Sequence, residues 1–318
     1  MSVRSDEGCP EAEIRPFEPD LASTSEGMVT MAGSQNIEAS ITDAGSNGAD
    51  RVVIDPARAV RDTPPLVHCL TNAVVKEITA NVLLAVGASP AMVEHSEEAG
   101  IFAGVANGLL VNVGTVSDTQ ISAIQAAVET ARTNGVPWVL DPVAVGSLPV
   151  RTELSRNLLE ARPSVIRGNA SEIVALAGLG HGGRGVESTD DVESALDAGR
   201  SLSERTGGVV AISGERDAIV SADRITWVTS GHPFMPLVIG TGCSLGATVA
   251  AYLGASRPAG LSDHDAAVAA HAHLGAAGTL AGRTAEGPGT FRVRWLDALY
   301  ELYPEGIART AEIVEDAP

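Results

Sequence analysis

Short apolar segments alternate with longer helix-compatible segments along most of this chain of 318 residues. The apolar runs are about four to six residues long, and amphipathic stretches of about ten residues or more separate them. The clearest runs cover residues 108–113, 137–140, 164–166 and 208–212. Alternation of this kind predicts βαβ units, a mostly parallel sheet with right-handed crossovers, and helices on both faces. The expected fold class is α/β.

Capping residues and glycines predict where several helices begin and end. Ser117 is placed to cap a long amphipathic helix that Gly135 ends, and Thr71 is placed to cap a helix that runs to Val86 and ends at Gly87. The remaining expected elements are a hairpin over 218–229 and helices over 152–161, 190–205, 244–252, 262–280 and 294–303.

The first 50 residues differ from the rest of the chain. They are acidic, rich in Ser, Glu and Gly, and show no sustained period. Because such a segment cannot bury enough apolar surface to offset its ordering entropy, we expect residues 1–50 to form a disordered extension. The folded domain is expected over residues 51–318.

Composition and charge limit the partners of this protein. The formal net charge of −19 argues against nucleic acid or an anionic membrane as a partner. The longer apolar stretches are interrupted by polar residues, and none approaches a membrane span. The three cysteines show no metal or disulfide spacing, and the first residues lack the pattern of a signal peptide. A cytoplasmic location is therefore expected.

The run VIGTGCSLGA over residues 238–247 is the most informative segment for function. Two glycines, Gly240 and Gly242, form a tight turn, and a helix-compatible segment follows at once. The backbone N–H groups of Thr241 and Gly242 at such a helix N-terminus favour a phosphate or an oxyanion. We expect the same partial positive charge to lower the pKa of Cys243. The alternative is an ordinary strand-to-helix turn with a buried cysteine packed as a small apolar residue.

Four polar residues follow predicted strands or stand close behind them. Asp141 can hold Mg²⁺, and Glu172 can join it if Asn169 and Glu172 share a helical face. Arg167 can clamp a nucleotide phosphate, and Ser213 can donate a hydrogen bond to it. Because ligands bind beyond the carboxyl ends of parallel strands, these side chains should converge with the Gly240 turn. The alternatives are helix caps, a surface salt bridge and an ordinary turn.

The turn at Gly240 suggests phosphoryl transfer, and two other motifs bear on this interpretation: the P loop of P-loop kinases and the nucleophile elbow of hydrolases. The chain lacks GxxxxGK[ST] and its one lysine, Lys76, lies inside a predicted helix, which excludes the P-loop kinases. Residues 242–246, GCSLG, fit the nucleophile elbow of hydrolases, with Ser244 as the nucleophile. The acids and histidines needed as triad partners stand in one predicted helix close behind, so a hydrolase is the weaker interpretation.

Seven short segments follow one another along the chain: PLVHCLTN at 65–72, GASPAM at 87–92, DPV at 141–143, IRGNASE at 166–172, GVES at 185–188, ISG at 212–214 and GTGC at 240–243. Taken together and in this order, they resemble the hydroxyethylthiazole kinases, a thiamine-salvage branch of the ribokinase-like superfamily. The resemblance covers roughly residues 61–254.

This resemblance implies a three-layer αβα fold without a separate lid domain. It implies Mg²⁺-dependent transfer of the ATP γ-phosphoryl group to the hydroxyl of 4-methyl-5-(2-hydroxyethyl)thiazole by a homotrimer. Met92 and Gly240 are then expected to contact the thiazole. By the same resemblance Cys243 occupies the position where most relatives place a catalytic aspartate. The remaining expected roles are ATP binding by Arg167 and Ser213, an anion hole at Thr241 and Gly242, and Mg²⁺ and phosphate contacts by Asp141 and Glu172.

Small departures from the family pattern concern binding detail. Glu187 stands where the family suggests aspartate, and Ser213 stands where threonine is common. The alternatives that the sequence leaves open are a hydroxymethylpyrimidine kinase, a thiol or serine enzyme with a covalent nucleophile, and a non-catalytic nucleotide-binding protein.

Overall fold

The computed structural model describes residues 48–179 and 192–316. The extension predicted over residues 1–50 lies outside these ranges, apart from residues 48–50, which begin helix α1 (Gly48–Asp62). Segment 185–188, with Glu187, also lies outside the described residues. Within the described ranges, no helix is long and apolar enough to cross a membrane.

The described residues form one sheet of nine strands. The strands are β1 (Leu66–Leu70), β2 (Ser89–Ala91), β3 (Gly108–Asn112), β4 (Trp138–Asp141), β5 (Val165–Asn169), β6 (Val209–Ser213), β7 (Asp217–Val220), β8 (Ile225–Thr229) and β9 (Glu312–Asp316). Their order is β2-β1-β3-β4-β5-β6-β7-β8-β9. The pairs from β2 to β6 are parallel, and the last three pairs are antiparallel. The predicted parallel sheet and the hairpin, β7 and β8, are confirmed.

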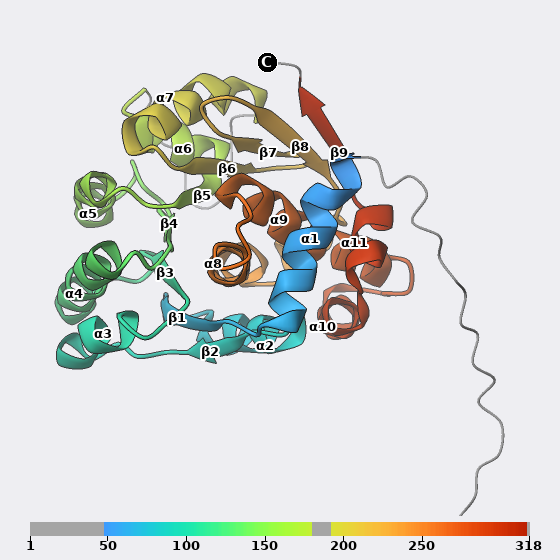
Figure 1. Cartoon of the computed structure of the whole chain (residues 1–318), viewed down its shortest axis with the longest axis horizontal. Helices are drawn as coiled ribbons and strands as arrows, with labels where there is room; N and C mark the ends of the chain where they lie inside the picture. Colours follow the sequence, from blue (N-terminus) through green and yellow to red (C-terminus); the bar gives the residue numbers. More distant parts are fainter. Residues whose placement is uncertain (1–47, 180–191, 317–318) are drawn as a thin grey trace, which may run out of the picture. The chain divides into compact units, whose positions relative to one another are not determined.

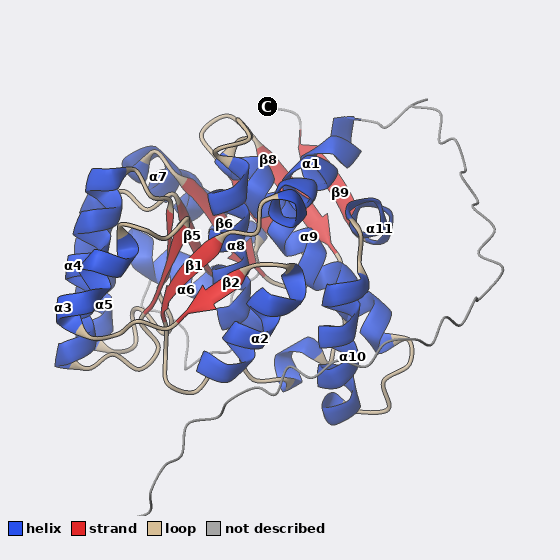
Figure 2. Cartoon of the chain, turned by 60° about the horizontal axis from the view of Figure 1, so that its bottom comes forward, coloured by secondary structure: helices blue, strands red, loops and turns tan. Residues whose placement is uncertain are grey.

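Helices cover both faces of this sheet, which confirms the three-layer α/β fold (Figures 1 and 2). The helices after α1 are α2 (Lys76–Val86), α3 (Ser96–Ala103), α4 (Asp118–Asn134), α5 (Pro149–Leu158), α6 (Ala170–Ala177), α7 (Leu196–Thr206), α8 (Thr241–Ser256), α9 (Asp263–Gly282), α10 (Pro288–Glu301) and α11 (Pro304–Thr310). Short 3₁₀ turns occur at Leu159–Ala161, Glu193–Ala195 and Met235–Leu237. One apolar cluster lies between the sheet and helices α1, α2 and α8 to α11, and a second lies between the sheet and helices α3 to α7.

Helix α2 begins later than the sequence predicted. Thr71 does not cap it; the helix begins at Lys76, while Gly87 ends it as expected in a left-handed conformation with φ 93°. The reason is local, because the Asn72 side-chain oxygen accepts the Val74 amide at 3.2 Å and holds a turn after β1. This turn keeps Asn72 at the end of its strand, where the functional residues gather.

Helix α8 packs directly against β3 because small residues let the two backbones approach. A β-carbon on Gly108 would lie 2.3 Å from the Ala250 carbonyl oxygen, and one on Gly254 would lie 2.9 Å from the Asn107 backbone. Most of α8 is buried, as expected for a helix that is apolar on all sides. The close packing fixes the helix N-terminus relative to the carboxyl ends of the central strands.

The strand order reverses at β1, which lies between β2 and β3. In open parallel sheets such a reversal leaves a crevice beyond the carboxyl ends of the strands, where ligands bind. The chain leaving β1 and β3 and the N-terminus of α8 meet on this side of the sheet, which positions the candidate site.

Candidate active site

A row of polar side chains crosses the carboxyl ends of β3, β4, β5 and β6. Asn112 pairs in register with Asp141, and the Asn112 Nδ2 donates to the Asp141 Oδ2 at 2.7 Å. The Arg167 Nη1 lies 3.8 Å from the same carboxylate oxygen, and the Arg167 Nε donates to the Ser213 hydroxyl at 3.1 Å. The expected convergence of Asp141, Arg167 and Ser213 is confirmed.

Arg167 lies within β5, whereas the sequence placed it after the strand. Pairing with β6 continues to Asn169 opposite Ser213, so the strand is longer than predicted. The Arg167 side chain is 11% exposed, and it contacts a carboxylate on one side and a hydroxyl on the other. Its guanidinium is therefore held in place, and it retains N–H donors for an anion.

Asp141 is the buried carboxyl group of the site. Burial raises its pKa to about 7, while the nearby charge of Arg167 acts in the opposite direction. Its Oδ1 is buried and makes no hydrogen bond with any described residue. An oxygen of this kind suits Mg²⁺, which commonly takes one or two carboxylates and fills its shell with water and substrate phosphates. The residues present therefore fit a hydrated magnesium ion, although the described ranges hold no group of three acidic, His or Cys ligands.

Glu172 has a clear structural role. Its Oε2 accepts the Asn169 amide and its Oε1 accepts the Ala144 amide, both at 2.9 Å. The Asn169 side chain in turn accepts the Glu172 amide, which completes a capping box at the start of α6. The capping arrangement that the sequence left open is therefore confirmed. A metal role for Glu172 stays a prediction, and its charge adds to the rise in the Asp141 pKa.

The N-terminus of α8 points into the same row of residues. Gly240 precedes the helix with φ 91°, and a β-carbon there would lie 2.4 Å from the Ile78 Cγ2, so this turn requires glycine. The amides of Gly242 and Cys243 donate to no described residue. A β-carbon on Gly242 would lie 3.2 Å from the Arg167 Nη1. Unpaired amides beside a guanidinium form an anion site.

Cys243 follows in the first turn of α8, and its predicted pKa shift is wrong. Burial raises the pKa of its thiol to about 11, and the nearby charge of Asp141 raises it further, while Arg167 lowers it. Desolvation is therefore the largest cause of the shift in this pKa. The Asn72 Nδ2 donates to the Cys243 Sγ at 3.4 Å. At neutral pH Cys243 is a thiol rather than a thiolate.

Sequence reasoning missed two asparagines that join these groups. The Asn72 Nδ2 also donates to the Asn112 Oδ1 at 3.0 Å, so a chain of amides leads from Cys243 to Asp141. Asn112 ends a buried strand as Asp141 does, and the same reasoning about strand ends would have selected it. Asn72 was not selected because it was placed inside the helix predicted to follow the Thr71 cap, whereas α2 begins only at Lys76.

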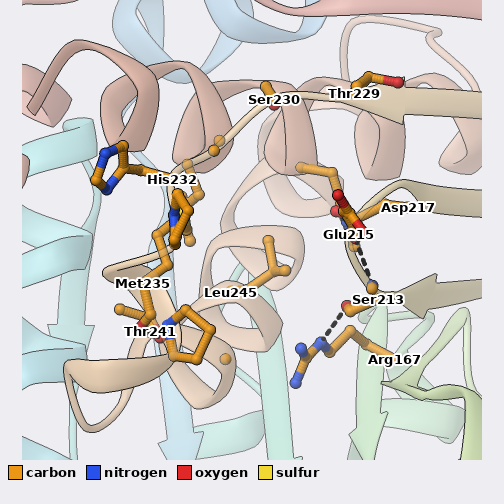
Figure 3. A pocket seen from close by; sticks show the side chains of 18 residues that line it. Arg167, Ser213, Glu215, Asp217, Thr229, Ser230, His232, Met235, Thr241 and Leu245 are labelled. Atoms are coloured by element: carbon orange, nitrogen blue, oxygen red, sulfur yellow. Dashed lines mark hydrogen bonds and ion pairs between the residues drawn. The ribbon is translucent and has the colours of Figure 1, made fainter. Parts of the chain in front are cut away.

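A cavity of about 750 Å³ opens beside Arg167 and the start of α8. Arg167, Ser213, Thr241 and Gly242 line it, and Figure 3 shows Arg167 and Ser213 along one wall, across from Thr241. From Arg167 the cavity continues past the end of β6, the start of β7 and the end of β8 to the chain that follows β8. Its volume matches that of sites for molecules the size of a nucleotide.

Met92 lies at a different part of the site. It follows edge strand β2 and packs, half-buried, against the apolar cluster that contains Val75 and Ile78. A β-carbon on Gly240 would meet these same two side chains. Gly240 therefore lies against the start of α2, and neither Met92 nor Gly240 lines the cavity beside Arg167.

The hydrolase interpretation of Ser244 is wrong. Ser244 is fully buried, and its hydroxyl donates to the Thr241 carbonyl at 3.1 Å. The histidines behind it bind other partners: His271 contacts Asp217 and His273 contacts Tyr252. Among the described residues no acid or histidine forms a hydrogen bond with the Ser244 hydroxyl.

Comparisons with known proteins agree with this geometry. The sequence model of the Hydroxyethylthiazole kinase family matches residues 57–305. A relative from Corynebacterium glutamicum (strain R), named hydroxyethylthiazole kinase, is 56% identical over 262 residues, covering 82% of this chain and 98% of the relative. The structure of a hydroxyethylthiazole kinase protein from Pyrococcus horikoshii OT3 superposes with a TM-score of 0.76 at 32% identity, covering 84% of this chain and all of that chain (100%). A Staphylococcus aureus pyridoxal kinase, solved with ADP, shares the fold alone, with a TM-score of 0.56, 15% identity, and coverage of 80% of this chain and 100% of that chain.

Proposed function

This chain belongs to the hydroxyethylthiazole kinase family, and we propose that it transfers the γ-phosphoryl group of ATP to the hydroxyl of 4-methyl-5-(2-hydroxyethyl)thiazole. The observation that carries the proposal is the Arg167 guanidinium beside the unpaired amides of Gly242 and Cys243. These donors stand at one end of a cavity of about 750 Å³, which has room for a nucleotide. The donors suit the phosphates, and the cavity suits the nucleoside.

Positioning and charge neutralisation are the main tasks of a phosphoryl-transfer site, because the transition state is loose and spreads charge over the phosphoryl oxygens. Arg167, held by Asp141 and Ser213, would bind these oxygens. The amides of Gly242 and Cys243 would donate to the same group without further rearrangement. The Cys243 thiol would orient the acceptor hydroxyl, since its raised pKa leaves it protonated.

We propose Asp141 as the residue that holds Mg²⁺, through its buried and unpartnered Oδ1. Glu172, fixed by its two backbone hydrogen bonds, would add negative charge beside the ion. Mg²⁺ bound there would neutralise the charge of the phosphates and align them for transfer.

The thiazole is expected to bind between Met92 and Gly240, where the family resemblance places it. Three exposed apolar side chains flank this region: Val74, Leu237 and Ile239 are 61%, 62% and 69% exposed. Apolar surface next to a substrate site suits an interface between copies of the chain, which supports the expected homotrimer. Light scattering on the purified protein should return the mass of three chains, and the mass of one chain would contradict this proposal.

The reaction is tested by ADP release with Mg²⁺ and a panel of thiazole, pyrimidine and sugar alcohols. Turnover should be fastest on the thiazole alcohol by at least about tenfold, a difference of about 1.4 kcal/mol in transition-state binding. Turnover on a pyrimidine alcohol instead would indicate the hydroxymethylpyrimidine kinase alternative. Nucleotide binding without ADP release on any alcohol would indicate a non-catalytic protein. Because the reaction consumes ATP, we propose that the protein works in the cytoplasm.

A further inference from the structure

The cavity beside Arg167 is electrically asymmetric. At one end lie Arg167 and the N-terminus of α8 at Gly242. Further along the same wall lie two carboxylates, Glu215 in the turn between β6 and β7 and Asp217 at the start of β7 (Figure 3). Carboxylates repel phosphates, so a triphosphate would place its charged end at Arg167. Its nucleoside would then extend toward Glu215 and Asp217.

The two carboxylates differ in how firmly they are held. The Asp217 Oδ1 accepts the Gly214 amide at 2.9 Å, and its Oδ2 accepts the His271 Nδ1–H at 2.7 Å. Glu215 is exposed, and no hydrogen bond or ion pair fixes its side chain to a described residue. Asp217 is therefore a rigid acceptor at the cavity wall, whereas Glu215 is a solvated one.

His271 is placed to hold Asp217. Its side chain is fully buried on α9, and the Asp217 side chain is 20% exposed. Both residues line the cavity. A carboxylate oxygen can only accept, so the Nδ1 of His271 must donate to it. The His271 Nε2 is buried without a partner among the described residues, so its bond to Asp217 is the only polar contact described for this ring.

No described lysine or arginine forms an ion pair with Asp217. A carboxylate has about four lone-pair positions, and two hydrogen bonds leave capacity for another donor. A ligand that covers Asp217 displaces water from its remaining lone-pair positions, and this desolvation costs free energy unless the ligand supplies a donor in place of the water.

We propose that Asp217 accepts a hydrogen bond from a neutral donor on the nucleoside part of the phosphoryl donor, and that His271 is its positioning residue. The donor is an O–H or N–H group, either a ribose hydroxyl or the amino group of the purine. The inference rests on the proposed function, because it takes the cavity to be the ATP site. It adds a residue that selects among nucleotides.

The experiment compares ATP, 2′-deoxy-ATP, 3′-deoxy-ATP and inosine triphosphate as phosphoryl donors, at a saturating concentration of the thiazole alcohol. For the wild type, the KM should be about tenfold higher for the analogue that lacks the relevant donor than for ATP. This factor corresponds to the loss of one charge-assisted hydrogen bond. The two deoxy analogues report on the ribose, and inosine triphosphate reports on the purine amino group. Asp217→Ala should raise the KM for ATP about tenfold, leave kcat within about threefold, and remove the discrimination.

Control variants separate positioning from general charge effects. Glu215→Ala removes a carboxylate from the same cavity and should keep the wild-type ratio between ATP and the discriminated analogue. His271→Gln should lower that ratio toward the value of Asp217→Ala, and the double variant should be no worse than Asp217→Ala alone. Should Asp217→Ala fail to fold, Asp217→Asn and His271→Gln give the same comparison.

Equal KM values for all four nucleotides in the wild type would overturn the proposal, and so would an unchanged ratio in Asp217→Ala. Calorimetric Kd values for ADP and the matching analogue diphosphates need no turnover. A wild type that binds these nucleotides with the expected selectivity but releases no ADP would contradict the proposed reaction while supporting the role of Asp217.

Discussion

Asp141→Asn should lower kcat/KM for ATP by about a hundredfold to a thousandfold, the loss typical of removing one preorganised electrostatic group. The substitution replaces the carboxylate whose buried Oδ1 is expected to hold Mg²⁺. It also removes the negative charge 3.8 Å from the Arg167 guanidinium. Steady-state ADP release across a range of Mg²⁺ concentrations measures the effect, and half-maximal activity should need more Mg²⁺ in the variant.

The fold should survive this substitution, so the loss can be assigned to the site. The asparagine oxygen can still accept from the Asn112 amide, which keeps the described hydrogen bond of 2.7 Å. A carboxyl group whose folded pKa is raised to about 7 loses stabilising free energy as the pH rises from about 4 to 7, and asparagine does not ionise. In the metal-free protein at pH 8, the melting temperature should therefore stay the same or increase.

The matched control is Asp297→Asn, which makes the same change at an exposed position on α10. It should leave kcat/KM and the response to Mg²⁺ unchanged. If Asp141→Asn retained more than a tenth of the wild-type kcat/KM, the proposed role of Asp141 would be wrong. A melting temperature far below that of the wild type would contradict the expected effect on stability.

The fold was predictable where local signals agree with the tertiary structure. The Ser117 cap and Gly135 predicted both ends of α4, because the Ser117 hydroxyl accepts the Gln120 amide and Gly135 takes a left-handed conformation. The sheet was predictable because strands buried on both faces must be apolar along their whole length. Strands β1, β2 and β9 were missed. Strands β2 and β9 lie at sheet edges and are not continuously buried, and the short strand β1 contains His68 among its apolar residues.

The sequence predicted which residues meet at the site, but it did not predict the pKa of Cys243. Residues at strand ends must meet in a parallel sheet, so the convergence of Asp141, Arg167 and Ser213 followed from position alone. The pKa of Cys243 could not be predicted from its position in the sequence, because it depends on how deeply the start of α8 is buried. That depth follows from the backbone contact between Gly108 and Ala250, which no local pattern reveals.

Cys243→Ala should lower kcat by about tenfold to a hundredfold and leave measurable residual activity. A positioned acid or base contributes about a hundredfold or more, and a protonated thiol that only orients the acceptor hydroxyl contributes less. Arg167 and the amides of α8 remain in the variant, so most of the charge stabilisation is kept. Steady-state ADP release with the thiazole alcohol measures the loss.

The pH dependence separates a thiol from a thiolate. Because the pKa of Cys243 is raised to about 11, a thiolate base would become more abundant throughout the range from pH 7 to 9. The ratio of wild-type to Cys243→Ala turnover would then rise about tenfold per pH unit. An orienting thiol stays protonated, so we expect a constant ratio. Alkylation of Cys243 by iodoacetamide at pH 7.5 should likewise be slow.

Cys243→Asp tests whether the site tolerates a true base at this position. The new carboxyl group would stand where burial and the charge of Asp141 both raised the pKa of the thiol, so its own pKa should rise toward neutrality. A general base works best with a pKa near the working pH, so this variant should retain or exceed wild-type turnover. Cys243→Ser, with a hydroxyl of similar size, should stay within about threefold of the wild type. Full activity in Cys243→Ala would remove the cysteine from the mechanism and leave Arg167, the α8 amides and Asp141 to account for catalysis.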